Sequence, residues 1–148
     1  MTDLQRETAA LLRALGAGLD VALEPDDHAA CGMRIDDRLD LALGCDERRA
    51  SVIASARVGE LPATAPEAAL RRLLAANHGA DAEVDAVWSL SGDTVVLTRR
   101  FPLAELDAQV LATALSELVA QAFEEQDALS GTPAAADVPP SMFGMVTA

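Results

Sequence analysis

The stretch RIDDRLDLALGCDE, residues 34–47, alternates apolar and polar residues almost without interruption. Successive side chains of an extended strand point to opposite faces, so every second residue shares a face. Four apolar residues fall on one face in this way: Leu39, Leu41, Leu43 and Cys45. This alternation is typical of an antiparallel sheet that buries one face. It predicts a sheet whose apolar face is packed against other elements of the protein.

Turn residues divide the neighbouring sequence into further strands. The pair Asp36–Asp37 predicts a tight hairpin turn, and Gly92 is expected to supply a positive φ angle in a second hairpin. The charged run DERR, residues 46–49, separates two more extended segments. The expected strands are 31–35, 38–45, 50–58, 84–90 and 94–101.

The chain begins with an expected amphipathic helix. Thr2 and Gln5 have the spacing of a capping box, and leucines then recur at helical spacing. Gly16 is expected to stop this helix, because glycine is a common residue just past a helix end. A turn-rich connection containing Pro25 then leads to the first strand.

Two more helices are expected between and after the hairpins. Thr64 and Glu67 form a second capping-box pattern, with Pro66 in the first turn, and this helix ends at about residues 77–79. A long helix is expected from about 107 to 129. Its apolar stripe is wide enough to cover one face of a sheet. The stripe contains Leu111, Leu115, Leu118, Val119, Ala122 and Phe123.

The order of elements predicts an α+β fold: helix, three-strand meander, helix, two-strand hairpin, helix. We expect a twisted antiparallel sheet packed against helices, with the first and last helices on one face. The middle helix has no obvious sheet surface left to cover on that face, which makes it a candidate for a subunit contact. Residues 1–130 are expected to form one domain. Residues 131–148 are expected to form a flexible Pro/Ala-rich tail, in which Met142, Phe143 and Met145 are a weaker candidate for a docking motif.

Charge and composition exclude several kinds of partner. The chain has 24 Asp and Glu, 11 Arg and no Lys, for a formal net charge of -13. Such a surface repels nucleic acid and anionic membranes. No run reaches the ~18 apolar residues of a membrane span, and the N-terminus lacks the pattern of a secretory signal. We therefore expect no nucleic acid, no membrane insertion and a cytoplasmic location.

No pattern in the sequence predicts catalysis or a cofactor. His28 lies in the acidic stretch EPDDHAAC, but paired ligand clusters of a zinc site are missing, so a solvated turn is favoured over a metal site. Nucleophile and phosphate-loop motifs are also missing. Cys31 and Cys45 are expected to be reduced in the cytoplasm. The Arg pairs at 71–72 and 99–100 are expected to pair with carboxylates rather than to bind an anion.

The chain resembles the class I chaperones of bacterial type III secretion, the Tir-chaperone (CesT-like) family. The resemblance covers about residues 4–127 and rests on the ordered succession of LLRALGAGLDVAL, RLDLAL, VGELP, ALRRLLAAN and VVLTRRFPLAELDAQVLATALSELVAQA. Small size and low isoelectric point are further family traits, and the sequence pI is about 4.3.

The resemblance implies a homodimer that binds the N-terminal region of a secreted effector and keeps it soluble and secretion-competent without ATP. An effector segment would add a strand to a sheet edge and place alternate side chains in apolar grooves. The implied partner-binding residues are Leu4, Leu11, Val21, Leu23, Met33 and Ile35. The implied dimer interface contains Leu70, Leu73, Leu74, Val87 and Trp88, although a core position is an equally good interpretation of a lone Trp in a strand.

Two other hypotheses remain open from the sequence. The first is a protein-interaction domain of the same fold with a different partner, similar to YbjN-like proteins. The second is a small acidic enzyme or metal-binding protein that uses His28 and nearby carboxylates.

Overall fold

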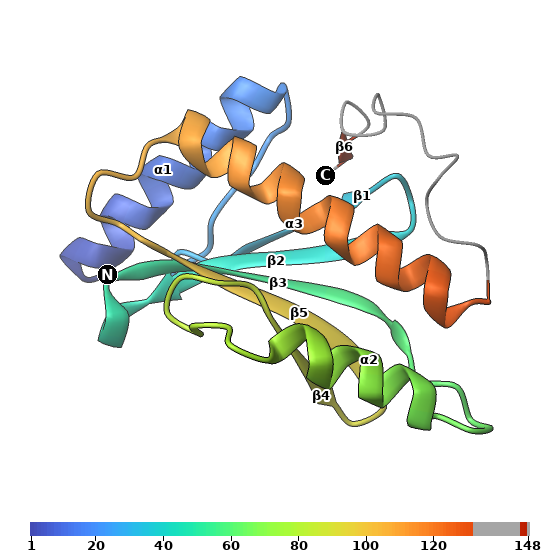
Figure 1. Ribbon diagram of the computed structural model, residues 1–148. Helices are drawn as coiled ribbons and strands as arrows, with labels where there is room; N and C mark the ends of the chain where they lie inside the picture. Colours follow the sequence, from blue (N-terminus) through green and yellow to red (C-terminus); the bar gives the residue numbers. More distant parts are fainter. Residues whose placement is uncertain (132–145, 148) are drawn as a thin grey trace.

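The structure is a computed structural model that describes residues 1–131 and 146–147. Figure 1 shows the order of its elements along the chain. The helices are α1 (Asp3–Leu19), α2 (Glu67–Asn77) and α3 (Ala108–Leu129), and a short 3-10 turn, η1, spans Glu47–Arg49. The strands are β1 (Cys31–Ile35), β2 (Leu39–Asp46), β3 (Ser51–Glu60), β4 (Val87–Ser91), β5 (Thr94–Pro102) and β6 (Val146–Thr147).

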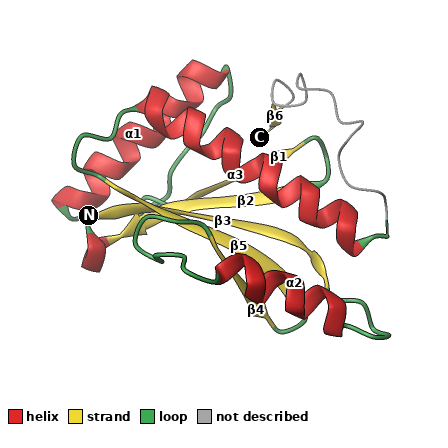
Figure 2. Ribbon diagram, viewed as in Figure 1, coloured by secondary structure: helices red, strands yellow, loops and turns green. Residues whose placement is uncertain are grey.

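The strands form one antiparallel sheet in the order β4-β5-β3-β2-β1-β6. Helices α1 and α3 lie on the same side of this sheet (Figure 2). The predicted α+β class and the predicted order of elements are confirmed, and β6 is an addition that the sequence did not predict. The expected tail, 131–148, falls mostly outside the described residues, as does its possible docking motif at Met142, Phe143 and Met145.

The alternation in residues 34–47 has the predicted structural result. Leu39, Leu41 and Leu43 are at most 2% exposed, whereas Asp40 and Ala42 between them are exposed. The predicted stripe of α3 covers this apolar face, because all six of its residues are buried in the same core cluster. Burial of apolar area between the sheet and α3 is therefore the main stabilising contact of the fold.

Two helix boundaries differ from the prediction. The capping box of Thr2 and Gln5 is formed, but α1 continues past Gly16 to Leu19 and stops at Asp20, which has a φ of 58°. Gly16 has a different role: the returning chain crosses the helix here, and a Cβ on Gly16 would lie 2.5 Å from the carbonyl oxygen of Val21.

The predicted capping box of the middle helix is wrong. Pro66 is the N-cap of α2, and no side chain caps the helix by a hydrogen bond. Ala65, just before it, has a φ of 52°. The chain therefore enters α2 through a left-handed residue that places Thr64 outside the capping position.

The expectation that the middle helix has nothing to cover is also wrong. Helix α2 packs on β4 beside α3, and its Leu73 belongs to the main core cluster. The Asn77 side chain accepts a hydrogen bond from the Trp88 N–H and donates one to the Trp88 carbonyl, both at 2.8 Å. The Arg72 guanidinium binds both carboxylate oxygens of Glu125, which is 8% exposed, and this contact raises the pKa of Arg72.

Gly16→Ala tests the crossing at the end of α1. We expect it to lower the free energy of unfolding by about 1–3 kcal/mol, because the new methyl group meets backbone. Gly18→Ala is the matched control: no atom lies within 4 Å of its added Cβ, so helix propensity predicts a gain of about 0.5–1 kcal/mol. Urea unfolding measures both variants, and a stability loss of equal size in both would contradict the close approach at Gly16.

Candidate functional site

An apolar crevice lies between β1, the end of α1 and α3. It is partly open to solvent and has a free volume of about 40 Å³. Its lining residues are Leu19, Met33, Ile35, Leu41, Ala112, Leu115, Ser116 and Val119. Ser116 is the one polar residue among them, and its hydroxyl donates to the Ala112 carbonyl at 3.1 Å. The crevice therefore favours a small aliphatic group over a polar one.

Periodicity on two elements explains why these residues converge. Met33 and Ile35 are two apart on β1, so both side chains lie on the helix-covered face. The four α3 residues are at positions i, i+3, i+4 and i+7 and thus share one helix face: Ala112, Leu115, Ser116 and Val119. Small residues at two of the four α3 positions leave the space that larger residues would fill.

The crevice opens beside the outer edge of the sheet. Strand β1 pairs over its full length with β2, and on its other side only Arg34 and Ile35 are paired, with β6. Among the described residues, 31–33 have no strand partner on that side. An edge strand presents backbone donors and acceptors to which another extended segment can add. Main-chain hydrogen bonds and an apolar crevice are thus available side by side.

Hydrogen bonds from α3 fix the position of the β1–β2 hairpin. Arg38, just after the turn, binds Asp127 at 2.8 Å, and its guanidinium lies 4.4 Å from the centre of the Phe123 ring. The Gln126 amide donates to the carbonyl oxygens of Arg38 and Val58, at 2.7 and 3.0 Å. These contacts hold the end of β1 against α3 and so fix the width of the crevice.

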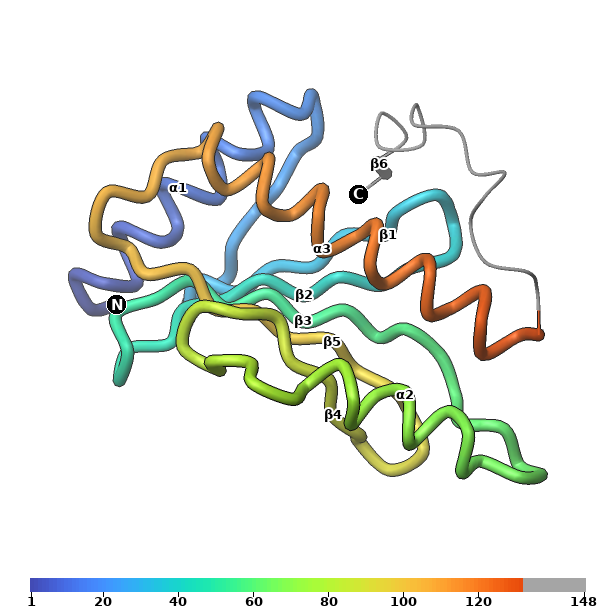
Figure 3. Tube along the Cα trace, in the orientation of Figure 1, coloured from blue at the N-terminus to red at the C-terminus, as the bar shows by residue number. Residues whose placement is uncertain are grey.

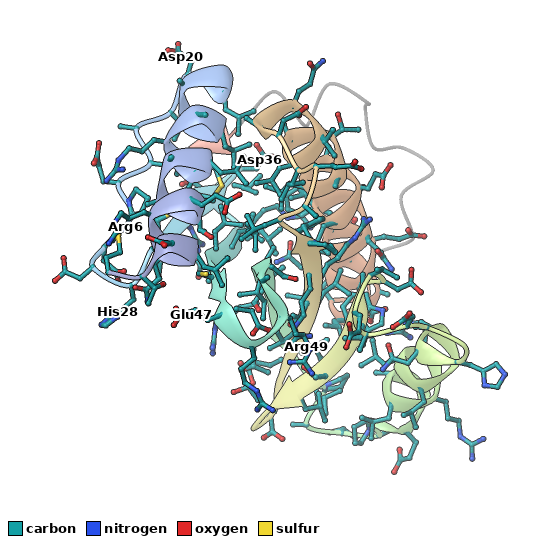
Figure 4. All side chains as sticks on the ribbon, turned by 90° about the vertical axis from the view of Figure 1, so that its left-hand side faces the viewer. Arg6, Asp20, His28, Asp36, Glu47 and Arg49 are labelled. Carbon is teal, nitrogen blue, oxygen red and sulfur yellow. The ribbon has the colours of Figure 1, made fainter. Side chains whose placement is uncertain are left out.

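The turn next to this edge carries negative charge. Asp36 and Asp37 both have positive φ, which identifies the predicted tight turn. Both carboxylate oxygens of Asp36 are buried, and neither has a hydrogen-bond partner among the described residues. Figure 4 shows Asp36 at the height of α1 and α3. A segment that brings a hydrogen-bond donor or a positive charge to this turn would offset the cost of burying that carboxylate.

The structure places the sequence-predicted partner residues in three environments. Met33 and Ile35 line the crevice. Leu23 is 3% exposed and belongs to the core. Leu4, Leu11 and Val21 are partly buried and pack against that core.

The crevice also contains residues that sequence reasoning did not assign to a site: Leu19, Leu41, Ala112, Leu115, Ser116 and Val119. The signal that could have found part of this wall is the i, i+3, i+4, i+7 spacing of its α3 residues. Two of these, Leu115 and Val119, were predicted only as a cover for the sheet.

The predicted dimer residues are divided between surface and core. Leu74 is 70% exposed, and Leu70 and Val87 are partly exposed. Leu73 and Trp88 are buried within the single chain, at 5% and 8% exposure. Val84 and Leu90, which were not predicted, are 47% and 44% exposed in β4 and the loop before it. Exposed apolar residues are therefore present on α2, on β4 and in the loop before β4, toward the opposite end of the sheet from β1.

The acidic stretch around His28 is a solvated turn. The Asp26 carboxylate accepts hydrogen bonds from the N–H groups of Ala30 and His28, and these bonds lower the pKa of Asp26. His28 itself points away from the sheet (Figure 4). In residues 1–131 and 146–147, no three His, Cys, Asp or Glu side chains are grouped so as to hold a metal ion.

Among the remaining polar candidates, three of the four arginines lie next to carboxylates. Cys31 and Cys45 are free thiols, and burial raises the pKa of Cys31. Of the predicted arginine pairs, Arg72 binds Glu125, Arg99 lies 3.6 Å from Glu117 and Arg100 lies 2.9 Å from Asp46. Within the described part of the chain, no helix has the length and apolar character needed to cross a membrane.

Three solved structures with a similar fold are complexes of two proteins. The Yersinia pestis type III secretion chaperone SycH, in complex with a stable fragment of YscM2, matches at 20% identity and a TM-score of 0.65, over 78% of this chain and 96% of that one. A chain of the ExsC–ExsE complex matches at 17% identity and a TM-score of 0.72, over 86% and 97%. A chain of the HopA1–SchA chaperone–effector complex matches at 18% identity and a TM-score of 0.70, over 86% and 98%.

The fold places the chain among small α+β proteins with an open antiparallel sheet covered by helices. The model of the Tir chaperone protein (CesT) family matches residues 10–124, and the chain belongs to this family. No curated protein sequence matches the chain. The resemblance inferred from the apolar spacing is thus confirmed.

Arg38→Ala tests the attachment of the hairpin to α3. We expect a loss of about 1–3 kcal/mol in the free energy of unfolding, because Asp127 and Gln126 lose a partner in a partly buried position. Arg6→Ala is the control: its partner Asp3 is 98% exposed, so the expected loss is below about 1 kcal/mol. Equal urea midpoints for the two variants would contradict a structural role for the Arg38 contacts.

Proposed function

We propose that this chain is a non-enzymatic type III secretion chaperone. It binds the N-terminal segment of a secreted effector in the bacterial cytoplasm, as a homodimer, and keeps that segment soluble and secretion-competent. The observation that carries the proposal is the apolar crevice directly beside the β1 edge, in a chain of the CesT family. Complexes among the solved neighbours support it, since SycH is bound to a fragment of YscM2 and SchA is in a chaperone–effector complex.

The effector segment binds as an added strand. Its backbone pairs with the outer edge of β1, which provides affinity that does not depend on sequence. Alternate side chains of the added strand face the helix side, where the crevice accepts an apolar residue. Binding in this way needs neither ATP nor a cofactor, because burial of apolar area and strand pairing supply the free energy.

The homodimer forms through the surface of α2 and β4. Leu74, Leu90 and Val84 are large apolar residues that remain 44–70% exposed in the single chain. Leu70 of α2 and Val87 of β4 are only partly buried. A second copy that covers this surface leaves both β1 edges and both crevices uncovered, because β4 and β1 lie toward opposite ends of the sheet.

The first experiment is co-expression with secreted proteins encoded at the same locus, followed by purification and light scattering. The expected product is a complex of two copies of this chain with one effector. A stable dimer that binds none of the secreted proteins would contradict the chaperone function and leave the fold unaffected.

Ala112→Phe tests the crevice with an effector found in this way. The added ring fills the space between α3 and β1, so we expect the affinity to fall roughly tenfold, which is about 1.4 kcal/mol. Ala120→Phe is the matched control, since Ala120 is exposed on the same helix outside the crevice. Calorimetry measures both, and unchanged affinity in a folded Ala112→Phe chain would exclude the crevice from the binding site.

Leu74→Asp tests the dimer surface. A charge at this exposed position leaves the core intact but opposes burial against a second copy, so we expect a monomer at low micromolar concentration. Ala75→Asp is the control, because Ala75 is also exposed and lies about a quarter-turn further around α2. Light scattering gives the mass, and a dimer in both variants would place the interface elsewhere. Leu73→Asp is unsuitable because Leu73 is in the core.

A further inference from the structure

The chain itself fills part of the edge proposed for the effector. Val146 lies opposite Ile35, and Thr147 lies opposite Arg34, in antiparallel pairing. This two-residue strand, β6, is the sixth strand of the sheet. Figure 1 shows it next to β1, and Figure 3 traces the chain from β1 to the end of α3, which separates the two strands in the sequence. A C-terminal segment thus occupies the place where an added strand would bind.

We propose that β6 is an intramolecular occupant of the β1 edge and that an incoming effector strand displaces it. The identity of the incoming strand rests on the proposed chaperone function. The occupancy of the edge by β6 does not, because it follows from the pairing of Val146 and Thr147 alone.

The length of the connecting chain is compatible with occupancy by the same molecule. Fourteen residues, 132–145, separate the end of the first described part from β6. A chain of this length spans at most on the order of 50 Å when extended. A tether of this kind also keeps the effective concentration of β6 near β1 on the order of millimolar. Pairing within one chain is therefore favoured over pairing between two chains at micromolar concentration.

The occupant is short enough to be displaced. Pairing covers only two of the five residues of β1, and a strand of two residues stabilises the edge marginally. An effector strand that pairs with all five residues forms more hydrogen bonds than β6 does. While β6 is paired with β1, the edge cannot accept another strand. The apparent affinity for an incoming strand therefore equals its intrinsic affinity multiplied by the fraction of molecules whose edge is free.

The unpaired part of β1 gives the incoming strand a starting point. Residues 31–33 have no partner on the outer side among the described residues, whereas Arg34 and Ile35 are paired with β6. An antiparallel strand can pair first at 31–33 and then extend toward Ile35, exchanging the β6 hydrogen bonds as it does so. The edge is thus shielded from unspecific sheet pairing while it remains accessible to a longer strand.

The test compares three full-length chains: the wild type, Val146→Pro with Thr147→Pro, and Val146→Ala with Thr147→Ala. The two prolines remove both backbone N–H groups of β6, so this strand loses its donors. The two alanines shorten the same side chains but keep the N–H groups. Both changes lie in β6, which pairs with β1.

Hydrogen exchange measured by mass spectrometry shows whether the edge is occupied. We expect amides of residues 31–35 to exchange several-fold faster in the proline variant than in the wild type, and the alanine variant to match the wild type. The central strand β3 is an internal reference, because its partners β2 and β5 are the same in all three chains. Equal exchange of residues 31–35 in all three chains would overturn the proposal.

A synthetic peptide with the sequence of residues 141–148 tests the edge as a strand acceptor. We expect this labelled peptide to bind the proline variant at least several-fold more tightly than the wild type, where β6 competes. A peptide with proline at the positions of Val146 and Thr147 is the control and should not bind. Equal binding of the native peptide to wild type and proline variant would count against displacement.

Light scattering of the same chains separates pairing within one chain from exchange between two. The wild type and the proline variant should have equal mass; a larger wild-type mass that the prolines reduce would overturn the intramolecular assignment. No effector is needed in these measurements. If the proposed chaperone function is wrong, the exchange and peptide results are still expected. If β6 does not occupy the edge, effector binding is still expected.

Discussion

Packing of α3 on the apolar face of the sheet is the contact on which the other features depend. Its buried stripe covers β3 and β5, and its polar residues hold the neighbouring elements. Glu125 binds Arg72 of α2, while Gln126 and Asp127 bind Arg38 next to the β1–β2 turn. The same helix supplies Ala112 to the crevice. Because one helix forms the core and one wall of the site, a shift of α3 would change both.

Local patterns predicted the fold, because each pattern records an interaction between near neighbours in the sequence. The alternation at Leu39, Leu41 and Leu43 depends only on strand geometry, and the capping box of Thr2 depends on one helical turn. Thr64 shows the limit of this reasoning: the spacing was correct, but a left-handed residue at Ala65 moved the threonine away from the cap.

The candidate site was less predictable because tertiary contacts create it. Met33 and Ile35 were implied by the resemblance to the chaperone family, but the facing wall on α3 has the same periodicity as an ordinary core stripe. Leu73 and Leu74 have the same side chain, so the sequence does not distinguish them. Which of the two faces solvent depends on how α2 packs on the rest of the protein. Strand β6 has two residues, too few for any period to show.

The two edges of the sheet are protected against pairing with other chains in different ways. An unprotected edge invites pairing with other chains, and a protein that keeps one for a partner must limit such pairing. At one end, β4 is short, and Leu74 of α2 and Leu90 of β4 are exposed apolar residues that the proposed second copy would cover. At the other end, β6 covers only Arg34 and Ile35 of β1. A formal net charge of -13 makes two free copies of the chain repel each other. A strand that binds stably at the β1 edge must therefore offset this repulsion through strand pairing and through burial of an apolar side chain.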